Sequence, residues 1–139
     1  ATFSNSLDVT HSLSAAFNYN FTKDLHASVG GVLRSGKPFT KPVEGNETIQ
    51  NGNKTIVNYN NPNTERLDNF FRIDVSGSYK FKFSDAVKST IRLGFTNITD
   101  RKNTIDSYYI IDTNSTNNVK RINSYSLPFT PNLSFRVSF

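Results

Sequence analysis

Side chains that carry out most enzyme chemistry are scarce in this chain. It contains no Cys, and its 139 residues include two His residues, His11 and His26. Thiolate chemistry is therefore excluded, and few side chains are available to bind zinc. Asp8 and His11 resemble an acid–base pair, but no nucleophile lies at a recognisable spacing from them. Asp106 and Asp112 lack the dense oxygen-ligand spacing of calcium loops. We therefore expect no enzyme, no metal site and no cofactor.

The charge and hydropathy of the chain exclude two further classes. The net charge is +5, but the Lys and Arg residues are spread singly, without the run or stripe that indicates nucleic-acid binding. Hydrophobic residues make up 35% of the chain, and no apolar run reaches the roughly 18 residues of a transmembrane helix. A transmembrane β-strand needs only about 9–11 residues, of which every second one can be polar.

The dominant signal in the sequence is alternation with period two, which places successive side chains on opposite faces of a strand. This alternation predicts five strands, and polar stretches rich in Asn, Gly, Pro and Thr separate them. The predicted strands span about 11–21, 25–35, 67–83, 88–99 and 126–139. No helical period is present, so the sequence predicts an all-β, antiparallel meander.

One face of every predicted strand is apolar, and the other carries the charges. A charge turned into lipid near the midplane costs roughly 2–4 kcal/mol for Arg or Lys, so the alternation strongly favours one register. Residues expected to face lipid are Leu13, Phe17, Tyr19, Val29, Leu33, Ile73, Val75, Tyr79, Phe81, Ile91, Leu93, Phe95 and Leu133. Charges expected to face a water-filled lumen are Arg34, Arg72, Asp74, Lys80, Arg92 and Arg136.

The connections between the predicted strands alternate between short turns and long loops. The long ones span about 36–66 and 100–125. Bacterial outer-membrane barrels sort their connections in this way, with short periplasmic turns and long extracellular loops. The strands assigned to run toward the periplasm end in aromatic residues on the apolar face, as an interfacial girdle requires. We therefore expect the chain to end on the periplasmic side of a Gram-negative outer membrane.

A soluble sandwich or lipocalin-like barrel would show the same period, with its apolar face buried inward. The sorted loops and the aromatic strand ends favour the membrane. Five strands leave two free sheet edges, and lipid does not tolerate these because every backbone N–H and C=O must be paired there. We therefore expect the chain to supply the last strands of a longer barrel.

Four segments, in this order along the chain, resemble the TonB-dependent outer-membrane receptors, particularly those of Bacteroidetes-type bacteria. They are 35–40 (SGKPFT), 66–81, 97–103 (NITDRKN) and 127–131 (LPFTP). The resemblance covers most of the chain from about Ser12 onward. It implies a barrel of about 22 strands that imports a scarce nutrient such as a siderophore, haem, cobalamin, glycan or peptide. It also implies an N-terminal plug domain, which we do not expect within this chain.

The final strand resembles the signal that the barrel-assembly machinery reads in outer-membrane proteins. That signal has a polar residue, then Gly, then alternate hydrophobic residues that end in an aromatic one. Asn132 takes the polar place, Phe135 and Val137 the hydrophobic places, and Phe139 the last place. Ser134 stands where Gly is usual, and Val137 where an aromatic residue is often found, so the match is incomplete.

By the same resemblance, ligand contacts come from the two long loops and the lumen. The candidates are Asn58, Tyr59, Tyr108 and Tyr109, and loop packing or an extended wall is the alternative role for each. Expected partners are outer-membrane lipid and lipopolysaccharide, the rest of the barrel with its plug, the TonB complex through that plug, and the barrel-assembly machinery. A surface lipoprotein is a further candidate partner. A passive porin-like barrel and a soluble β-sheet binding module remain alternatives.

Overall fold

The computed structural model describes residues 4–139, and this part of the chain is all-β with antiparallel strands. No helix in residues 4–139 is long and apolar enough to cross a membrane. The strands in chain order are β1 (Ser12–Asn20), β2 (Leu25–Arg34), β3 (Pro38–Phe39), β4 (Thr48–Asn51), β5 (Lys54–Val57), β6 (Glu65–Arg66), β7 (Phe70–Lys82), β8 (Lys88–Thr96), β9 (Thr104–Ile111), β10 (Val119–Tyr125) and β11 (Thr130–Ser138).

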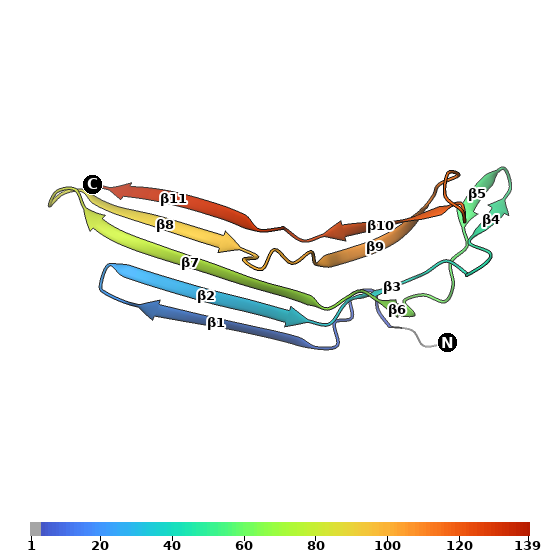
Figure 1. The fold of residues 1–139 in the computed structure, drawn as a ribbon, viewed down its shortest axis with the longest axis horizontal. Helices are drawn as coiled ribbons and strands as arrows, with labels where there is room; N and C mark the ends of the chain where they lie inside the picture. The colour runs from blue at the N-terminus through green and yellow to red at the C-terminus, as the bar shows by residue number, and fades with distance from the viewer. Residues whose placement is uncertain (1–3) are drawn as a thin grey trace. The chain divides into compact units, whose positions relative to one another are not determined.

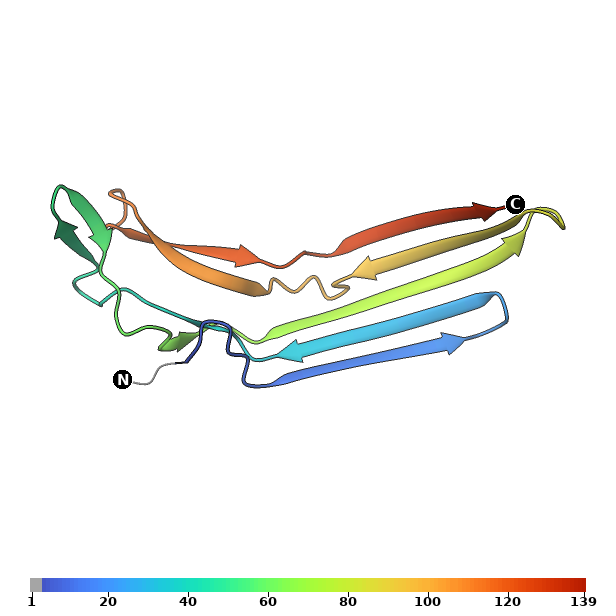
Figure 2. The same cartoon turned by 180° about the vertical axis from the view of Figure 1, so that it is seen from behind.

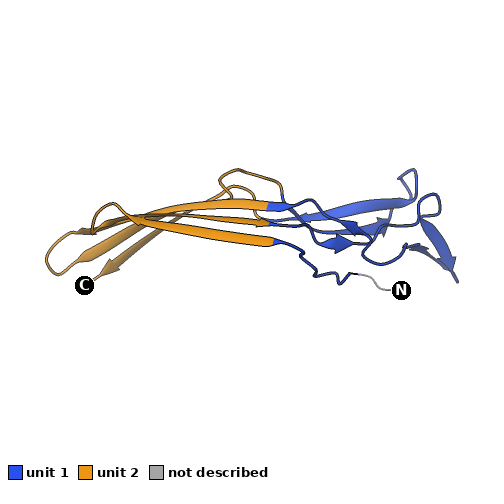
Figure 3. Ribbon diagram, turned by 90° about the horizontal axis from the view of Figure 1, so that it is seen from below, with its two compact units in different colours: residues 1–11, 34–70, 103–126 blue, residues 12–33, 71–102, 127–139 orange. Residues whose placement is uncertain are grey.

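The strands belong to two compact units, which Figure 3 shows in different colours. We call the first the sheet unit; it consists of residues 12–33, 71–102 and 127–139. We call the second the loop unit; its described part consists of residues 4–11, 34–70 and 103–126. The long connections of the sheet thus fold as a unit of their own.

The sheet unit is built on one five-stranded sheet with the order β1-β2-β7-β8-β11 (Figures 1 and 2). Each of these strands lies within a range that the alternation predicts, and the predicted ranges extend past the strands by a few residues. Neighbours in the sheet follow one another in sequence once the long connections are set aside. β1 and β11 are the two edges, so the sheet is open.

The register of β7, β8 and β11 keeps apolar and polar side chains on separate faces. Leu93 on β8 lies opposite Gly77 on β7 and Leu133 on β11, which are positions of the predicted apolar face. One residue away, Arg92 lies opposite Ser78 and Ser134, on the other face. The pairing therefore agrees with the faces that period two predicts for these three strands.

The two short turns lie at the same end of the sheet, which we call the turn end. The backbone N–H of Lys80, near the end of β7, donates a 2.9 Å hydrogen bond to the carbonyl of Asp24 in the β1–β2 turn. Ser138, the last residue of β11, pairs with Lys88, the first residue of β8. The end of β11 therefore also lies at the turn end (Figures 1 and 2).

The loop unit contains three two-stranded ladders: β3 with β6, β4 with β5, and β9 with β10. β9 lies against both β3 and β5. The buried hydrophobic side chains of the described residues are in this unit: Phe39 at 6%, Leu67 at 7% and Phe70 at 7% exposed. A small apolar core therefore holds together segments that the sequence presents as polar loops.

Gly36 forms the closest backbone contact in this small core. A Cβ at position 36 would overlap the carbonyl group of Leu67, so no larger residue fits without movement of the backbone. Beside it, the Leu67 N–H donates a 2.9 Å hydrogen bond to the Lys37 carbonyl. The Arg34 guanidinium lies 4.2 Å from the centre of the Phe70 ring, in cation–π geometry. These contacts fix the chain where β2 ends and β7 begins.

Candidate functional site

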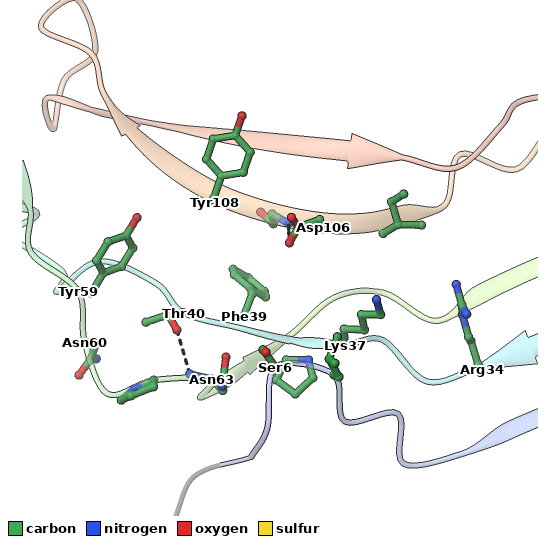
Figure 4. A pocket seen from close by; sticks show the side chains of 15 residues that line it. Ser6, Arg34, Lys37, Phe39, Thr40, Tyr59, Asn60, Asn63, Asp106 and Tyr108 are labelled. Carbon is green, nitrogen blue, oxygen red and sulfur yellow. Dashed lines mark hydrogen bonds between the residues drawn. The ribbon is translucent and has the colours of Figure 1, made fainter.

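An open groove of about 880 Å³ with aromatic and charged lining lies in the loop unit. Figure 4 shows its side chains. The lining residues come from the segment before β1, from β3 and its flanks, from the segment between β5 and β6, and from β9. They are Ser6, Leu7, Arg34, Lys37, Pro38, Phe39, Thr40, Tyr59, Asn60, Pro62, Asn63, Ile105, Asp106, Ser107 and Tyr108.

The groove combines exposed aromatic rings with both signs of charge. Tyr59 and Tyr108 are 46% and 48% exposed, whereas Phe39 is buried at 6%. Arg34 and Asp106 supply opposite charges within the same lining. Tyr rings offer apolar area together with a hydroxyl, and ligand sites combine such surfaces with a few polar groups. The groove is therefore suited to a ligand with both apolar and polar parts.

Backbone contacts between distant segments shape this lining. The Tyr59 hydroxyl donates a 3.3 Å hydrogen bond to the carbonyl of Tyr109 on β9. The Asn63 N–H donates a 3.0 Å hydrogen bond to Thr40 Oγ1, drawn as a dashed line in Figure 4. Asn63 has a φ of 55°, which Asn tolerates better than most residues. The segment between β5 and β6 is thus tied to β9 and to the residue after β3.

The four predicted ligand contacts divide into two pairs. Tyr59 and Tyr108 line the groove, so they remain predicted contacts. Asn58 does not line it, and its side-chain amide donates a 2.8 Å hydrogen bond to the Asn46 carbonyl. Tyr109 is also outside the lining, and its backbone carbonyl accepts the hydrogen bond from the Tyr59 hydroxyl. The positions of Asn58 and Tyr109 favour a structural role.

Sequence reasoning missed Arg121, which supports the groove from β10. Its guanidinium lies 4.6 Å from the centre of the Phe39 ring, and its Nε donates a 2.6 Å hydrogen bond to Ser107 Oγ. Ser107 Oγ in turn donates to Asn123 Oδ1 at 2.8 Å. No local pattern in the sequence relates residue 39 to residue 121, so no signal was available to predict this contact.

A second concave surface lies on the polar face of the sheet unit. It is a hollow of about 440 Å³, and residues from all five strands line it. Ser28 and Ser76 share a 2.8 Å hydrogen bond across β2 and β7, and Arg92 Nη2 donates to Ser76 Oγ at 3.4 Å. Asn18 and Asn132 contribute from the edge strands. The hollow therefore offers hydroxyls, amides and a guanidinium on a floor of small side chains.

Five of the six predicted lumen charges lie on this polar face, and two of these five pair with each other. Arg72 Nη2 lies 3.0 Å from Asp74 Oδ2, a partner that the sequence alone left unassigned. Arg92 lines the hollow, while Lys80 and Arg136 both lie opposite Thr90, nearer the turn end. Arg34, at the end of β2, lies in the loop unit and lines the groove there.

The predicted lipid-facing side chains lie on the opposite face of the sheet, and this face is exposed. Phe17, Leu93 and Phe135 are 63%, 45% and 56% exposed, so no layer of the described chain covers them. The other exposed members are Leu13, Tyr19, Val29, Leu33, Tyr79, Ile91 and Leu133. The half-buried members are Ile73, Val75, Phe81 and Phe95.

Aromatic rings gather on this apolar face toward the turn end. Tyr19 contacts Phe17 and Phe21, with ring centres 6.3 and 4.8 Å apart. The Phe81 ring centre lies 6.3 Å from that of Phe135, which joins β7 to β11 across β8. Tyr79 and Phe83 extend the group, as their rings pack on either side of Phe81. The rings thus form two groups, one on β1 and one on β7 and β11, which we together call the aromatic row.

The residues predicted to act as an assembly signal lie on both faces of β11. Phe135 and Val137 belong to the exposed apolar face, and Phe139 follows the strand. Asn132 lies on the polar face opposite Gly94, where an added Cβ would sit 2.7 Å from Asn132 Oδ1. Their recognition by the assembly machinery stays a prediction.

No family model, no curated protein and no solved structure matches this chain. Within residues 4–139, no group of three or more His, Asp or Glu side chains is placed to hold a metal ion. The groove of the loop unit and the two faces of the sheet unit are therefore the basis for assigning a function.

Proposed function

We propose that this chain forms part of the wall and the outer loops of a TonB-dependent transporter in the outer membrane of a Gram-negative bacterium. In this role the apolar face contacts lipid, and the polar face lines the lumen of a barrel. The observation that carries the proposal is the exposed apolar face, which runs across all five strands and lies opposite a polar hollow.

The exposure of this face is hard to reconcile with a free surface in water. Phe17, Leu93, Leu133 and Phe135 are all at least 45% exposed, and burial of apolar area is worth about 25 cal/mol per Å². Soluble monomers rarely expose continuous apolar patches beyond a few hundred Å². Lipid removes this cost without a second protein layer. A soluble binding module would instead need another sheet or partner over the same face.

The strand lengths also suit a membrane wall. β1, β8 and β11 have 9 residues each, β2 has 10 and β7 has 13, against the roughly 9–11 that a tilted transmembrane strand requires. The open edges at β1 and β11 need partner strands, because unpaired backbone groups in hydrocarbon cost several kcal/mol each. We therefore propose that further strands, from the same polypeptide, close the barrel on both sides.

The positions of the turns and aromatic rings support one orientation. The short turns share one end of the sheet with the aromatic row on the apolar face. Barrels place short turns in the periplasm and aromatic girdles at the interfaces. With the turn end in the periplasm, the segments that form the loop unit emerge on the extracellular side. The groove with Tyr59 and Tyr108 is then available to a nutrient outside the cell.

The substrate class follows from the family resemblance and from the chemistry of the groove. A siderophore, haem, cobalamin, glycan or peptide has both apolar and polar parts, which matches the Tyr rings, the buried Phe39 and the charged Arg34 and Asp106. A passive porin would have no need of such a lining. Active uptake against low external concentration does need a binding site.

The test is to express the complete reading frame that contains this chain and to measure uptake. A panel of labelled ferric siderophores, haem, cobalamin, glycans and peptides would be offered to cells with and without TonB. We expect the protein in the outer-membrane fraction and uptake of one class only when TonB is present. Uptake that persists without TonB would indicate a porin, and protein in the soluble fraction would overturn the membrane assignment.

A further inference from the structure

The positive charge of the chain is concentrated in the sheet unit. This unit holds nine Lys and Arg residues against four Asp residues and no Glu, whereas the two signs balance in the loop unit. The whole net charge of +5 therefore belongs to the sheet unit. Because its apolar face carries no charge within the strands, the excess lies on the polar face and in the connections.

Strand pairing gathers five of these cations on the polar face near the turn end. Lys82 lies directly opposite Lys88, in the row of β7 and β8 closest to the turn. Lys80 and Arg136 flank Thr90 in the next row, and Arg92 occupies the row after that. We call Lys80, Lys82, Lys88, Arg92 and Arg136 the basic patch. Like charges directly opposite each other destabilise a sheet, so this patch is unfavourable by itself.

Within the described residues, no ion pair joins a cation of the basic patch to a carboxylate. The ion pairs Lys41–Glu65, Arg66–Asp8 and Arg72–Asp74 involve no member of the patch. Asp24 and Asp85 lie in the two turns beside the patch, where the Asp24 carbonyl accepts a 2.9 Å hydrogen bond from the Lys80 N–H. Asp74 lines the same hollow as Arg92, but its Oδ2 lies 3.0 Å from Arg72 Nη2. The five cations of the patch therefore keep an excess of positive charge over the two turn carboxylates.

The surroundings of the basic patch indicate the chemistry of its partner. Every aromatic side chain within the strands of the sheet unit occupies an apolar-face position. The polar face therefore lacks the stacking platforms that nucleic acids use. The hollow beside the patch has a floor of small residues, including Ser28, Gly30, Ser76 and Gly94, which allows close approach of a chain.

We propose that the polar face docks a polypeptide segment rich in Asp and Glu. One carboxylate would enter the hollow and bind Arg92, whose Nη2 donates to Ser76 Oγ at a long 3.4 Å. Further carboxylates would lie among Lys80, Lys82, Lys88 and Arg136. Alternate side chains along one strand are about 6.8 Å apart, the same spacing that an extended peptide gives to its own alternate residues. This docking goes beyond the proposed transport role and does not require a membrane.

The test measures binding of labelled peptides to the full chain in nonionic detergent by fluorescence anisotropy. The probes are a short peptide that alternates Glu with Ser, its Lys–Ser counterpart, and single-stranded RNA. The test variant combines Lys80→Gln, Lys82→Gln, Lys88→Gln and Arg92→Gln. A matched control removes the same charge away from the turn end, with Lys41→Gln, Lys54→Gln, Lys102→Gln and Lys120→Gln. Circular dichroism checks that both variants keep their β structure.

We expect the Glu–Ser peptide alone to bind, with an affinity that falls steeply at about 0.5 M salt. The test variant should weaken this binding by roughly tenfold or more, while the control should keep it within about twofold. Equal losses in the two variants, no binding, or equal binding of RNA would overturn the proposal. If the combined variant loses its structure, Arg92→Gln alone should still weaken binding, and unchanged affinity would overturn the proposal. If the chain is soluble without detergent and binds the Glu–Ser peptide, the proposed membrane role is refuted and the docking proposal stands.

Discussion

The backbone N–H of Asn97 donates a 2.9 Å hydrogen bond to Asp74 Oδ1, which ties the residue after β8 to the polar face of β7. Asn97 is completely buried and has a φ of 53°. Its side-chain amide donates 3.0 Å hydrogen bonds to the carbonyls of Arg101 and Leu127. Its Oδ1 accepts from the Thr99 hydroxyl at 3.2 Å. Through its backbone N–H and its side chain, this one residue thus joins β7, the end of β8 and the segment that leads to β11.

Replacement of Asn97 by Ala should destabilise the sheet unit by about 2–4 kcal/mol. The change removes the donor to the carbonyls of Arg101 and Leu127, at about 0.5–1.5 kcal/mol for each hydrogen bond, and places Ala in a left-handed backbone conformation. Urea unfolding of the chain in detergent measures the effect. The control Asn51→Ala, at an exposed site on β4, should change the unfolding free energy by less than about 0.5 kcal/mol. Similar values for both variants would contradict the role of Asn97.

Replacement of Gly36 by Ala should destabilise the loop unit by about 1–3 kcal/mol, the usual range for overpacking. The added methyl group would overlap the Leu67 carbonyl. Gly30→Ala is the matched control, since its Cβ would meet the Ala15 carbonyl at an ordinary 3.8 Å. Hydrogen exchange of the Leu67 amide, which bonds to Lys37, reports on the site. Unchanged exchange in Gly36→Ala would show that the backbone adapts freely.

The five long strands could be predicted from the sequence because their signal is local. Apolar and polar side chains alternate along each of them. Leu93 and Phe135 lie on the apolar face, while Arg92 and Arg136 lie on the polar face. The ends of the strands are harder to predict than their centres, because polar turn residues can continue the alternation by chance. Thus the predicted range 67–83 began three residues before β7 does.

The candidate site could be predicted only in part, because it depends on contacts between distant segments. Tyr59 and Tyr108 stood out as amphipathic residues within polar loops, and both line the groove. The contacts of Arg121 with Phe39, and of Gly36 with Leu67, join residues that no repeat or spacing connects. The segment 97–103 carries part of the family resemblance, but the sequence does not show which distant residues Asn97 bonds to, such as Leu127.

Substitution in the groove should weaken nutrient uptake without loss of assembly. Tyr108→Ala removes an exposed ring from the lining, and loss of an aromatic contact of this kind commonly costs more than about 1 kcal/mol in binding. We expect the half-saturation concentration for uptake by the complete protein to rise roughly tenfold. Tyr109→Phe is the control, because Tyr109 contributes its backbone carbonyl rather than its hydroxyl to Tyr59. Equal uptake by Tyr108→Ala and the unmodified protein would exclude this ligand surface.

A charge on the apolar face should impair membrane assembly more than one on the polar face. Leu93→Arg in the complete protein places a cation in lipid, at roughly 2–4 kcal/mol. Thr90→Arg adds a cation beside Lys80 and Arg136, which costs at most about 1 kcal/mol in a cross-strand pair. Quantitative blotting of outer-membrane fractions measures the yields. Equal yields of the two variants would contradict the assignment of faces.

Labelling along β8 tests the lipid contact of the apolar face most directly. The chain has no Cys, so single variants Thr90→Cys, Ile91→Cys, Arg92→Cys and Leu93→Cys each report one position. In the complete protein in bilayers, fluorophores at 91 and 93 should be quenched by brominated lipid chains, and those at 90 and 92 by a water-soluble quencher. Quenching by lipid at 90 and 92, or the same quenching at all four positions, would contradict a sheet with one face in hydrocarbon and the other in water.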